Sequence, residues 1–449
     1  MEQNKKFRKS TPFPLTFWTA NTIELFERAA YYSVASFVVI YLNEVLGMKP
    51  TFSTFLNGSV LWGLIYFLPI LSGAVADHLG FKRTLTAALV LMLFGYLIMG
   101  TLPRFWPFLL AASRDEKLNF TIPVVIGIVL IGIGGSVVKP CISGTVQKTA
   151  GLRATLGFGI FYMIINIGSI LGRTISYFIR TNFGIPSIFS FAAFPFILLG
   201  FFIVIFLYHE PKYSSGEIIQ KRSLSQAILG IFTVLGNLRF VFFLIVIGGF
   251  WFIYIQIYNL IPLYLRFMDR NAPVELYTLV NPVMIVCFQL LVTKLVKKWR
   301  PVKSIMAGVL VTTAGISLNI IPALTGVLSK TINFGPIFVP VAGLFIILAI
   351  ASIAVGEMIA SPRIYEYIGS IAPKGQEGLF LGYANLPIAI GTIVGAPIGG
   401  MIFERFIAFP SKIGNPPSTP VMWMIVAFTG LGSALGIFIY DRLVTRTKK

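Results

Sequence analysis

The sequence consists of long apolar stretches separated by short polar ones. Stretches of about twenty apolar residues recur along the whole chain, and each is long enough to cross the hydrocarbon core of a bilayer as a helix. They are continuous rather than alternating, which excludes a transmembrane β-barrel. The pattern predicts an all-α membrane protein with about twelve transmembrane helices. We expect these helices near Phe17–Leu46, Phe55–Val75, Leu85–Leu102, Ile122–Val146, Leu156–Phe178, Ile188–Tyr208, Phe240–Leu265, Tyr277–Val296, Ile305–Leu328, Ile337–Ile359, Leu379–Ile402 and Val421–Tyr440.

A polar connection after the sixth expected helix divides the chain into two halves. Within it, apolar residues recur at helical spacing from Leu224 to Leu238, which predicts an amphipathic helix on the membrane surface. We therefore expect a six-helix bundle over residues 1–208, a linker with this helix over 209–238, and a second six-helix bundle over 239–449. Two such bundles suit a transporter whose halves rock about a central site.

Composition and charge narrow the class further. The mean hydropathy is +0.85 and only 12% of the residues are charged, which leaves too little polar surface for a soluble domain. The formal net charge of +20 would suggest nucleic acid in a soluble protein, but here the basic residues gather at helix ends. Cationic loops stay on the cytoplasmic side and meet anionic lipid there. We therefore expect a monomer in the cell (inner) membrane, with both termini cytoplasmic and no nucleic-acid partner.

The first apolar stretch carries ionisable residues in the segment ELFERAAYY. Glu24, Glu27, Arg28 and Tyr31 are spaced by three and four residues, so they lie on one face of a helix. An ionisable group in hydrocarbon costs several kcal/mol unless it is paired or hydrated. Two acids beside one base can hold or release a proton, which favours a functional cluster; an ion pair that fixes helix packing is the alternative.

Two further charges lie in later apolar stretches. Lys139, in the segment GIGGSVVKPC, is expected near the middle of the membrane and must find an acid. Pro140 frees a backbone carbonyl and can kink the helix. Glu357, in the tenth stretch, can face Lys139 across a central cavity. Such a pair would form in one state of the protein and break in another.

The fifth stretch, FYMIINIGSILGR, carries polar residues on one helical face. Tyr162, Asn166, Ser169 and Arg173 follow helical spacing. Asn166 can hydrogen-bond either a substrate or a neighbouring helix. Taken alone, the position of Arg173 favours a side chain that snorkels to the outer interface.

Two other segments carry weaker signals. Asp77 is expected in a glycine-bounded turn between the second and third helices, where it can bond a helix end and a basic side chain. This predicts a gating latch rather than a substrate site. The seventh stretch contains Trp251, Tyr254, Gln256 and Tyr258, and aromatic residues within a span usually serve packing.

Taken together, these segments resemble a known family. The Asp77 turn resembles the signature loop of the major facilitator superfamily, and ELFERAAYY resembles the ExxERxxYY motif of its proton-dependent oligopeptide transporters. GGSVVKPCISG and FYMIINIGS resemble that family's motifs on helices 4 and 5. The matches occur in both halves and in the family's order. On helices 7, 8 and 10 the resemblance lies in Trp251 with Gln256, Asn281-Pro282, and Glu357 with Ser361-Pro362.

The resemblance implies proton-coupled symport by alternating access, with the proton as coupling ion and no metal or other cofactor. For proton coupling it implies Glu24, Glu27, Arg28 and Lys139. For substrate binding it implies Tyr31, Asn166, Trp251, Gln256, Glu357 and Ser361, with Glu357 facing the amino end of a peptide. It also implies a Lys139–Glu357 contact that closes the cytoplasmic side, so the gating residues are Asp77, Lys139 and Glu357.

Two positions depart from the family's pattern. Peptide-transporting members usually carry an Arg where this chain has Ala35, and an acid where it has Ile255. These two groups are normally partners across the outer gate, so losing both strands no buried charge. The plant nitrate and peptide branch lacks the same Arg, which leaves a non-peptide solute open. One hypothesis is that Arg173, two turns beyond Asn166 on the same face, replaces the lost clamp for a substrate carboxylate.

We therefore predict a proton-coupled symporter that imports di- or tripeptides or a related small solute. One alternative is an exporter or a carrier of a small anion such as nitrate on the same scaffold. Another is a membrane sensor that binds solute, but a sensor would need a sizeable output domain beyond the tails and the linker. Enzymatic activity is not expected, because His78 and His209 lie at loop ends and no nucleophile–base pair lies in the spans.

Overall fold

The structure is a computed structural model that describes residues 13–105, 118–211, 224–328, 330–334, 337–372, 380 and 382–446. Within these residues, ten helices are long and apolar enough to cross a membrane. Two further spans are broken, one bent by 41° and the other by 44°. Counting each broken pair as one span gives the twelve spans that the sequence predicts, so the all-α membrane fold is confirmed.

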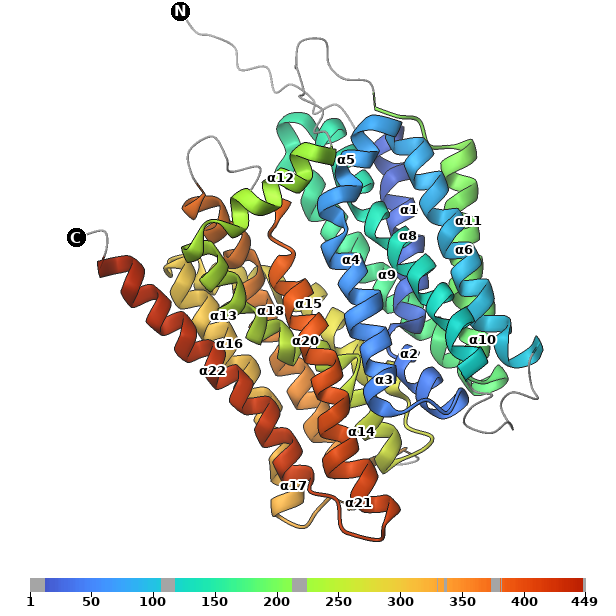
Figure 1. Ribbon diagram of the computed structural model, residues 1–449, viewed down its shortest axis with the longest axis vertical. Coiled ribbons are helices and arrows are strands. Elements are labelled where there is room, and N and C mark those ends of the chain that lie inside the picture. Colours follow the sequence, from blue (N-terminus) through green and yellow to red (C-terminus); the bar gives the residue numbers. More distant parts are fainter. Residues whose placement is uncertain are drawn as a thin grey trace, which may run out of the picture.

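The spans fall into two groups that lie side by side (Figure 1). We call the elements before the linker the first half and those after it the second half. The first half contains α1 (Leu15–Ala35), α2 (Val38–Ile40), η1 (Tyr41–Val45), α3 (Pro50–Thr54), η2 (Phe55–Trp62), α4 (Gly63–Phe67), α5 (Pro69–Leu79), α6 (Phe81–Phe105), α8 (Leu118–Ala150), η3 (Gly151–Arg153), α9 (Ala154–Phe183), α10 (Pro186–Ile188), η4 (Phe189–Ala193) and α11 (Phe194–Phe206).

The linker contributes α12 (Leu224–Leu235), as the helical spacing of its apolar residues predicts. The second half contains α13 (Leu238–Tyr254), η5 (Ile255–Ile257), α14 (Leu260–Met268), α15 (Val274–Val296), α16 (Pro301–Ser317), η6 (Leu318–Ile320), α17 (Ile321–Leu324), β1 (Thr331–Phe334), β2 (Ile337–Pro340), α18 (Val341–Ile371), α20 (Leu386–Phe403), η7 (Glu404–Ala408), α21 (Phe409–Lys412) and α22 (Thr419–Arg446).

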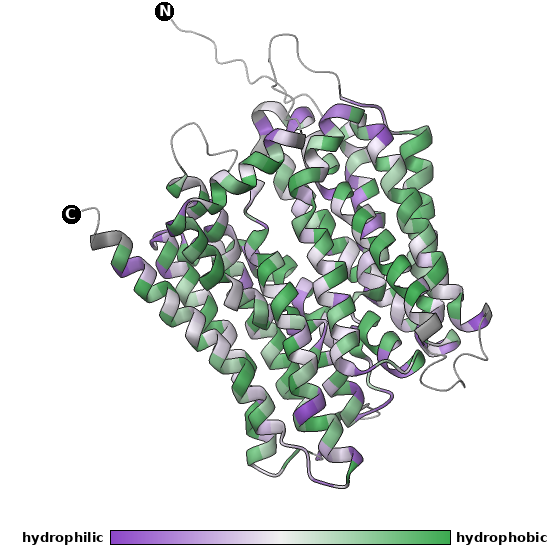
Figure 2. Cartoon of the chain, viewed as in Figure 1, coloured by the Kyte–Doolittle hydropathy of each residue, from purple (hydrophilic) through white to green (hydrophobic). Residues whose placement is uncertain are grey.

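The helix α12 lies across one end of both halves (Figure 1). One face of the helix is exposed and apolar, with Leu229 63% and Phe232 70% exposed, while Ala227 and Val234 of the same helix are buried. The exposed apolar face matches a helix that lies on the membrane surface, and Figure 2 shows the helix largely in green, the colour of hydrophobic residues. We call this end of the molecule the linker end, and the opposite end, where α2, α3 and α14 lie, the far end.

The tenth expected helix is wrong at both of its ends. Residues 337–340 form β2, which pairs antiparallel with β1, and the helix α18 starts only at Val341. The β-branched residues Ile332 and Val339 favour this hairpin, and Pro340 precedes the helix. At the other end, the helix continues to Ile371 through its polar turns. Arg363 sustains these turns by bonding Glu366 on its own helix and the carbonyl of Val296 on α15.

The helix α1 packs closely against α9 through two glycines. A Cβ on Gly168 would lie 2.7 Å from the carbonyl oxygen of Leu25, and one on Gly172 would lie 2.9 Å from the amide nitrogen of Ser33. Small residues permit such approaches between helices within a membrane. The contact holds the charged face of α1 and the polar face of α9 together in the first half.

Every hydrogen bond and ion pair that joins described residues of the two halves lies between the far end and the middle of the spans. The ion pairs are Glu44–Arg266 and Arg180–Glu275. The hydrogen bonds are Ser36–Thr278, Thr51–Glu404, Asn57–Asn259, Asn57–Tyr258, Ser59–Ile393, Arg173–Thr278 and Arg173–Tyr258. Over the part of the chain that the structure describes, the linker end has no such bond between the halves.

Candidate functional site

The charged residues of α1 form the cluster that their spacing predicts. The Nε atom of Arg28 lies 2.5 Å from Oε2 of Glu27 and 3.4 Å from Oε1 of Glu24. All three side chains are almost fully buried. Neither carboxylate oxygen of Glu24 accepts a hydrogen bond from a described residue, and the same holds for Oε1 of Glu27. Three ionisable groups thus share a buried site in which one guanidinium is the counter-ion of two carboxylates.

Lys139 lies on α8 beside this cluster, and its electrostatic neighbours are Arg28, Glu24 and Glu27. It forms no ion pair with any described residue. This structure shows no ion pair between Lys139 and Glu357, which agrees with a pair that forms in one state of the protein and breaks in another, so the contact stays a prediction. The physical reason for their separation is that Lys139 belongs to the first half and Glu357 to the second, and the halves are bonded only farther toward the far end.

Glu357, on α18, is held by residues of its own half. The amide Nδ2 of Asn281, on α15, donates to Oε2 of Glu357 at 3.2 Å, and the hydroxyl of Tyr254 lies nearby. Its electrostatic neighbours include Tyr162 of α9 and Tyr365 of α18. Tyr162 is 42% exposed and Tyr365 40% exposed. Neither ring is therefore fully covered by neighbouring residues.

Aromatic rings connect the two halves beside this acid. The ring of Tyr31 lies 5.8 Å from that of Trp62, and Trp62 lies 4.7 Å from Tyr258 of the second half. Tyr258 is in turn 6.3 Å from Tyr254, whose ring is 5.1 Å from Trp251. The hydroxyl of Tyr31 is buried and has no described hydrogen-bond partner. Trp251 is 8% exposed, so it packs mainly against its neighbours.

The polar face of α9 points toward the second half. The side chain of Asn166 donates to the carbonyl of Tyr162 one turn earlier on its own helix, at 3.0 Å. Arg173 has no exposed surface, so the expectation that it snorkels to the outer interface is wrong. Its Nε donates to Oγ1 of Thr278 at 3.2 Å and its Nη2 to the hydroxyl of Tyr258 at 3.0 Å. Both partners are on the other half, which covers the guanidinium and keeps it from the membrane surface.

The remaining expected substrate residues are arranged differently. Gln256 is fully buried, and its Nε2 donates to the carbonyls of Phe252 at 2.8 Å and of Gly395, on α20, at 3.0 Å. These bonds join helices of the second half. Ser361 is half-buried on α18, and its hydroxyl has no described hydrogen-bond partner. Ser361 therefore lies on the same helix as Glu357, whereas the hydrogen bonds of Gln256 hold two helices of the second half together.

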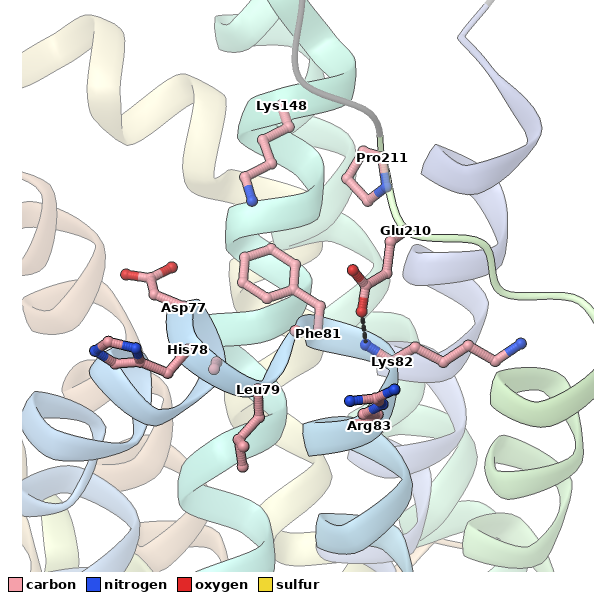
Figure 3. A pocket seen from close by; sticks show the side chains of 11 residues that line it. Asp77, His78, Leu79, Phe81, Lys82, Arg83, Lys148, Glu210 and Pro211 are labelled. Atoms are coloured by element: carbon pink, nitrogen blue, oxygen red, sulfur yellow. Dashed lines mark hydrogen bonds between the residues drawn. The ribbon is translucent and has the colours of Figure 1, made fainter. Parts of the chain in front are cut away.

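The sequence expectation for Asp77 also needs correction. Asp77 lies in the last turn of α5, not in a loop. The residue that follows the helix is Gly80, which has a φ of 86°. Among the described residues Asp77 makes no ion pair. It lines a cavity of about 500 Å³ with Glu210, whose carboxylate accepts the backbone N–H of Lys82 at 2.8 Å (Figure 3). A carboxylate at the N-terminus of α6 stabilises the start of that helix, and the carboxylate that lies there is Glu210 rather than Asp77.

Several residues of this region were not expected from the sequence. Trp62 makes the aromatic contact with Tyr258 described above, and the ring of Tyr32 lies 5.1 Å from that of Tyr31. Arg180 and Glu275 form an ion pair at 2.8 Å. One signal was available, because Arg180 follows Arg173 by seven residues and so lies on the same helical face. No comparable signal marks Trp62, because its environment depends on helices that are distant in the sequence.

The fold defines a polytopic membrane protein with charged residues buried inside its spans. The chain belongs to the major facilitator superfamily, whose family model matches residues 22–355. Dipeptide and tripeptide permease B of Aliivibrio fischeri (strain MJ11) is 31% identical over 177 residues. That match covers 38% of this chain and 32% of the permease, so the chain aligns with about a third of that relative.

Solved structures extend the likeness to the whole chain. A transporter of the proton-dependent oligopeptide transporter (POT) family, solved in complex with 5-aminolevulinic acid, has a TM-score of 0.71. It is 18% identical, and the match covers 96% of each chain. The structure of tetrameric PepTSo2 has a TM-score of 0.68 at 18% identity, with 97% of this chain and 98% of that chain covered. The resemblance to proton-dependent oligopeptide transporters that the motifs indicate is thereby confirmed.

Proposed function

We propose that the protein is a proton-coupled symporter that imports di- or tripeptides, or a related small solute, by alternating access. The observation that carries this proposal is the separation of two buried charged sites. The cluster of Glu24, Glu27, Arg28 and Lys139 belongs to the first half, and Glu357 belongs to the second. A carboxylate that gains or loses a proton in such a site changes which ion pairs the halves can form.

The arrangement of the bonds supports a state open to the cytoplasm. The basic loops of the linker end put that end, and both termini, on the cytoplasmic face by the positive-inside rule. The bonds between the halves then close the outer side. In the opposite state the linker end closes, and Lys139 and Glu357 meet there as a pair. The proton is the only coupling ion in this scheme, and no other cofactor takes part.

The substrate occupies the space beside Glu357, between the aromatic residues of both halves. Tyr162 and Tyr365 are exposed there, and Tyr31, Asn166 and Ser361 lie on the helices around it. A carboxylate in a site that excludes most water attracts a cationic group strongly. Glu357 is therefore the partner of the amino end of a peptide, as the family resemblance implies.

The test is uptake by the purified protein in vesicles that contain a pH-sensitive dye. Dipeptides and tripeptides should acidify the lumen, and uptake should rise as the outside is made more acidic than the inside. Glu24→Gln and Lys139→Ala should each abolish accumulation against a gradient. The first variant lacks a carboxyl group that can bind the proton, and the second lacks the cation that forms the ion pair. Glu366→Gln is the matched control, since Glu366 is an exposed acid bonded to Arg363 on its own helix. Concentrative uptake in both cluster variants would refute the mechanism.

A second candidate substrate is a small non-peptide anion such as nitrate. Ala35 and Ile255 support it, because both are buried and apolar where peptide transporters carry a charged pair. In the same vesicles, acidification by nitrate but not by peptides would select this candidate. Solute binding without any acidification would instead select a sensor.

We further propose that the protein resides in the inner (cell) membrane as a monomer. The bacterial relative and the two-half architecture support this, although one similar solved structure is a tetramer. Mass measurement of the purified protein in detergent and in lipid nanodiscs tests the oligomeric state. A mass of four chains in both environments would contradict the proposal.

A further inference from the structure

Arg173 is a buried cation that has no acidic partner among the described residues. Its exposed fraction is 0%. Its hydrogen bonds go to the neutral groups of Ser169, Thr278 and Tyr258, and the ring of Tyr32 lies 4.6 Å from its guanidinium carbon. Arg28 and Arg180, the other buried arginines of these helices, both pair with glutamates.

An unpaired guanidinium within the membrane is costly. The penalty amounts to several kcal/mol, and such a group is normally paired or functional. In this structure, neutral oxygens and an aromatic face compensate the charge only in part. An anion that reaches Arg173 in another state of the protein would account for a charge at this position.

The partners of Arg173 indicate which state that is. Thr278 and Tyr258 belong to the second half, whereas Ser169 lies on the same helix as Arg173. Separation of the halves at the far end would remove Thr278 and Tyr258 from the guanidinium. The freed N–H groups form a planar fork that matches the two oxygens of a carboxylate.

The position of Arg173 also fits the end of α1, where this chain has Ala35 in place of the arginine that the family usually carries. Thr278 bonds both Arg173 and Ser36, at 3.2 Å and 2.9 Å, so the guanidinium lies beside the α1 terminus that carries Ala35. Tyr258 has electrostatic contact with both Arg173 and Glu357. A cation and an acid thus both lie near one tyrosine, and recognition of a zwitterion requires two such opposite charges.

We propose that Arg173 receives the carboxylate of the substrate while the far end is open. Closing of the far end returns the guanidinium to Tyr258 and Thr278, and these groups displace the carboxylate toward the linker end. The substrate class is therefore a small zwitterion with a free carboxylate. This inference rests on the proposed transport function and concerns one step within it.

The experiment compares alanylalanine with alanylalanine amide, which lacks the carboxylate, in the vesicle uptake assay. Arg173→Gln should raise the KM for alanylalanine by about 10- to 100-fold, the effect of losing a charge-assisted pair of hydrogen bonds. Its KM for the amide should stay within about twofold of the parent, since the amide offers no carboxylate to lose. Arg173→Lys should recover part of the preference for the free acid, because it keeps the charge and loses the fork.

Two further variants separate recognition from structure. Arg180→Gln, seven residues further along the same helix face, breaks an ion pair and should affect both compounds equally. Tyr258→Phe removes a competitor for the guanidinium, so it should lower both KM and kcat for alanylalanine. Thermal unfolding of each variant in detergent checks that it is folded.

An equal loss for both compounds in folded Arg173→Gln, or a Tyr258→Phe variant that does not lower KM, would overturn the inference and leave the proposed function standing. Failure of the parent protein to transport either compound would overturn the peptide function itself and this inference with it.

Discussion

The far end and the linker end of the molecule differ in how the two halves meet. At the far end, Ser36 just after α1 and side chains of η1, α3, η2 and α9 bond the second half. Their partners lie on α14, on α15, at the η5–α14 junction and on the α20–η7 segment. At the linker end, the described residues bond within their own half or to the linker. Glu357 with Asn281 is a contact of the first kind, and Lys82 with Glu210 and Tyr383 with the carbonyl of Ala227 are contacts of the second kind.

The difference shows how a protein of this kind can open at one end. Apart from the two ion pairs, the far-end contacts are single hydrogen bonds. Those between neutral groups are each worth about 0.5–1.5 kcal/mol, and those that involve Glu404 or Arg173 about 1.5–3 kcal/mol. Only Arg180–Glu275 is an ion pair with both side chains largely buried, 12% and 1% exposed. A gate built mainly of weak bonds can be broken by a modest change elsewhere, whereas the charged cluster on α1 lies within one half and need not break.

The largest expected effect is that of Glu275→Gln. It leaves Arg180 buried without a counter-ion, which costs about 3–5 kcal/mol in the closed far end. The population should therefore shift toward the state open at that end. The readout is alkylation of Ala35→Cys, a buried far-end position, in a background without the exposed Cys287. We expect labelling to accelerate by at least about tenfold.

The matched control replaces both partners by apolar residues, Arg180→Met with Glu275→Met. Such exchanges of a whole buried pair are often close to neutral, so labelling should return most of the way to the parent rate. If the single variant labelled as slowly as the parent, this ion pair would not hold the far end closed.

The second effect comes from close packing. A Cβ on Gly400 of α20 would meet Oγ1 of Thr54 and lie 2.8 Å from Cα of Thr51, both on α3. Gly400→Ala should therefore cost about 1–3 kcal/mol in the closed far end and speed labelling of Ala35→Cys. Gly159→Ala is the linker-end counterpart, because no atom lies within 4 Å of its Cβ. Equal labelling rates for the two variants would contradict the packing difference between the ends.

The third effect is that of a single hydrogen bond. Ser36→Ala removes the 2.9 Å bond to Thr278 and should cost about 0.5–1.5 kcal/mol, seen as labelling that is a few times faster. Thr278→Val removes this bond together with that from Arg173. A double-mutant cycle measures the coupling of the pair. Fully additive effects would mean that the two hydroxyls do not interact.

The smallest effect belongs to the outermost ion pair. The side chain of Glu44 is 33% exposed and that of its partner Arg266 13% exposed, so water screens their attraction. Glu44→Gln should change far-end stability by about 0–1 kcal/mol, and less at high salt. An effect as large as that of Glu275→Gln, or one that persists in high salt, would show that this pair is also a main element of the gate.

Much of the fold could be predicted from the sequence, because a bilayer requires each backbone segment to satisfy its own hydrogen bonds as a helix. Lengths and apolar content therefore locate the spans. They do not reveal the bends at Ala35–Val38 and at Leu68–Pro69, nor the strand Ile337–Pro340 in place of the start of a helix. These features depend on contacts with other segments and on local backbone preferences that hydropathy does not measure.

The candidate site divides in the same way. The cluster of Glu24, Glu27 and Arg28 follows from local spacing, since residues three and four apart on a helix meet in any tertiary structure. The surroundings of Arg173 do not, because spacing identifies a helical face but not the helix that covers it. For that reason a side chain expected at the membrane interface is instead enclosed between the halves.

By itself, the sequence determined the number of spans, the linker helix and the charged face of α1, all of which depend on neighbouring residues along one helix. Only the tertiary structure decided that Arg173 meets Thr278 and Tyr258, that Arg180 meets Glu275, and that Lys139 and Glu357 stay apart. These contacts join helices of different halves. Two arrangements of rigid halves share the same local helices, so the pattern along the chain is compatible with either arrangement and only the positions of the halves distinguish them.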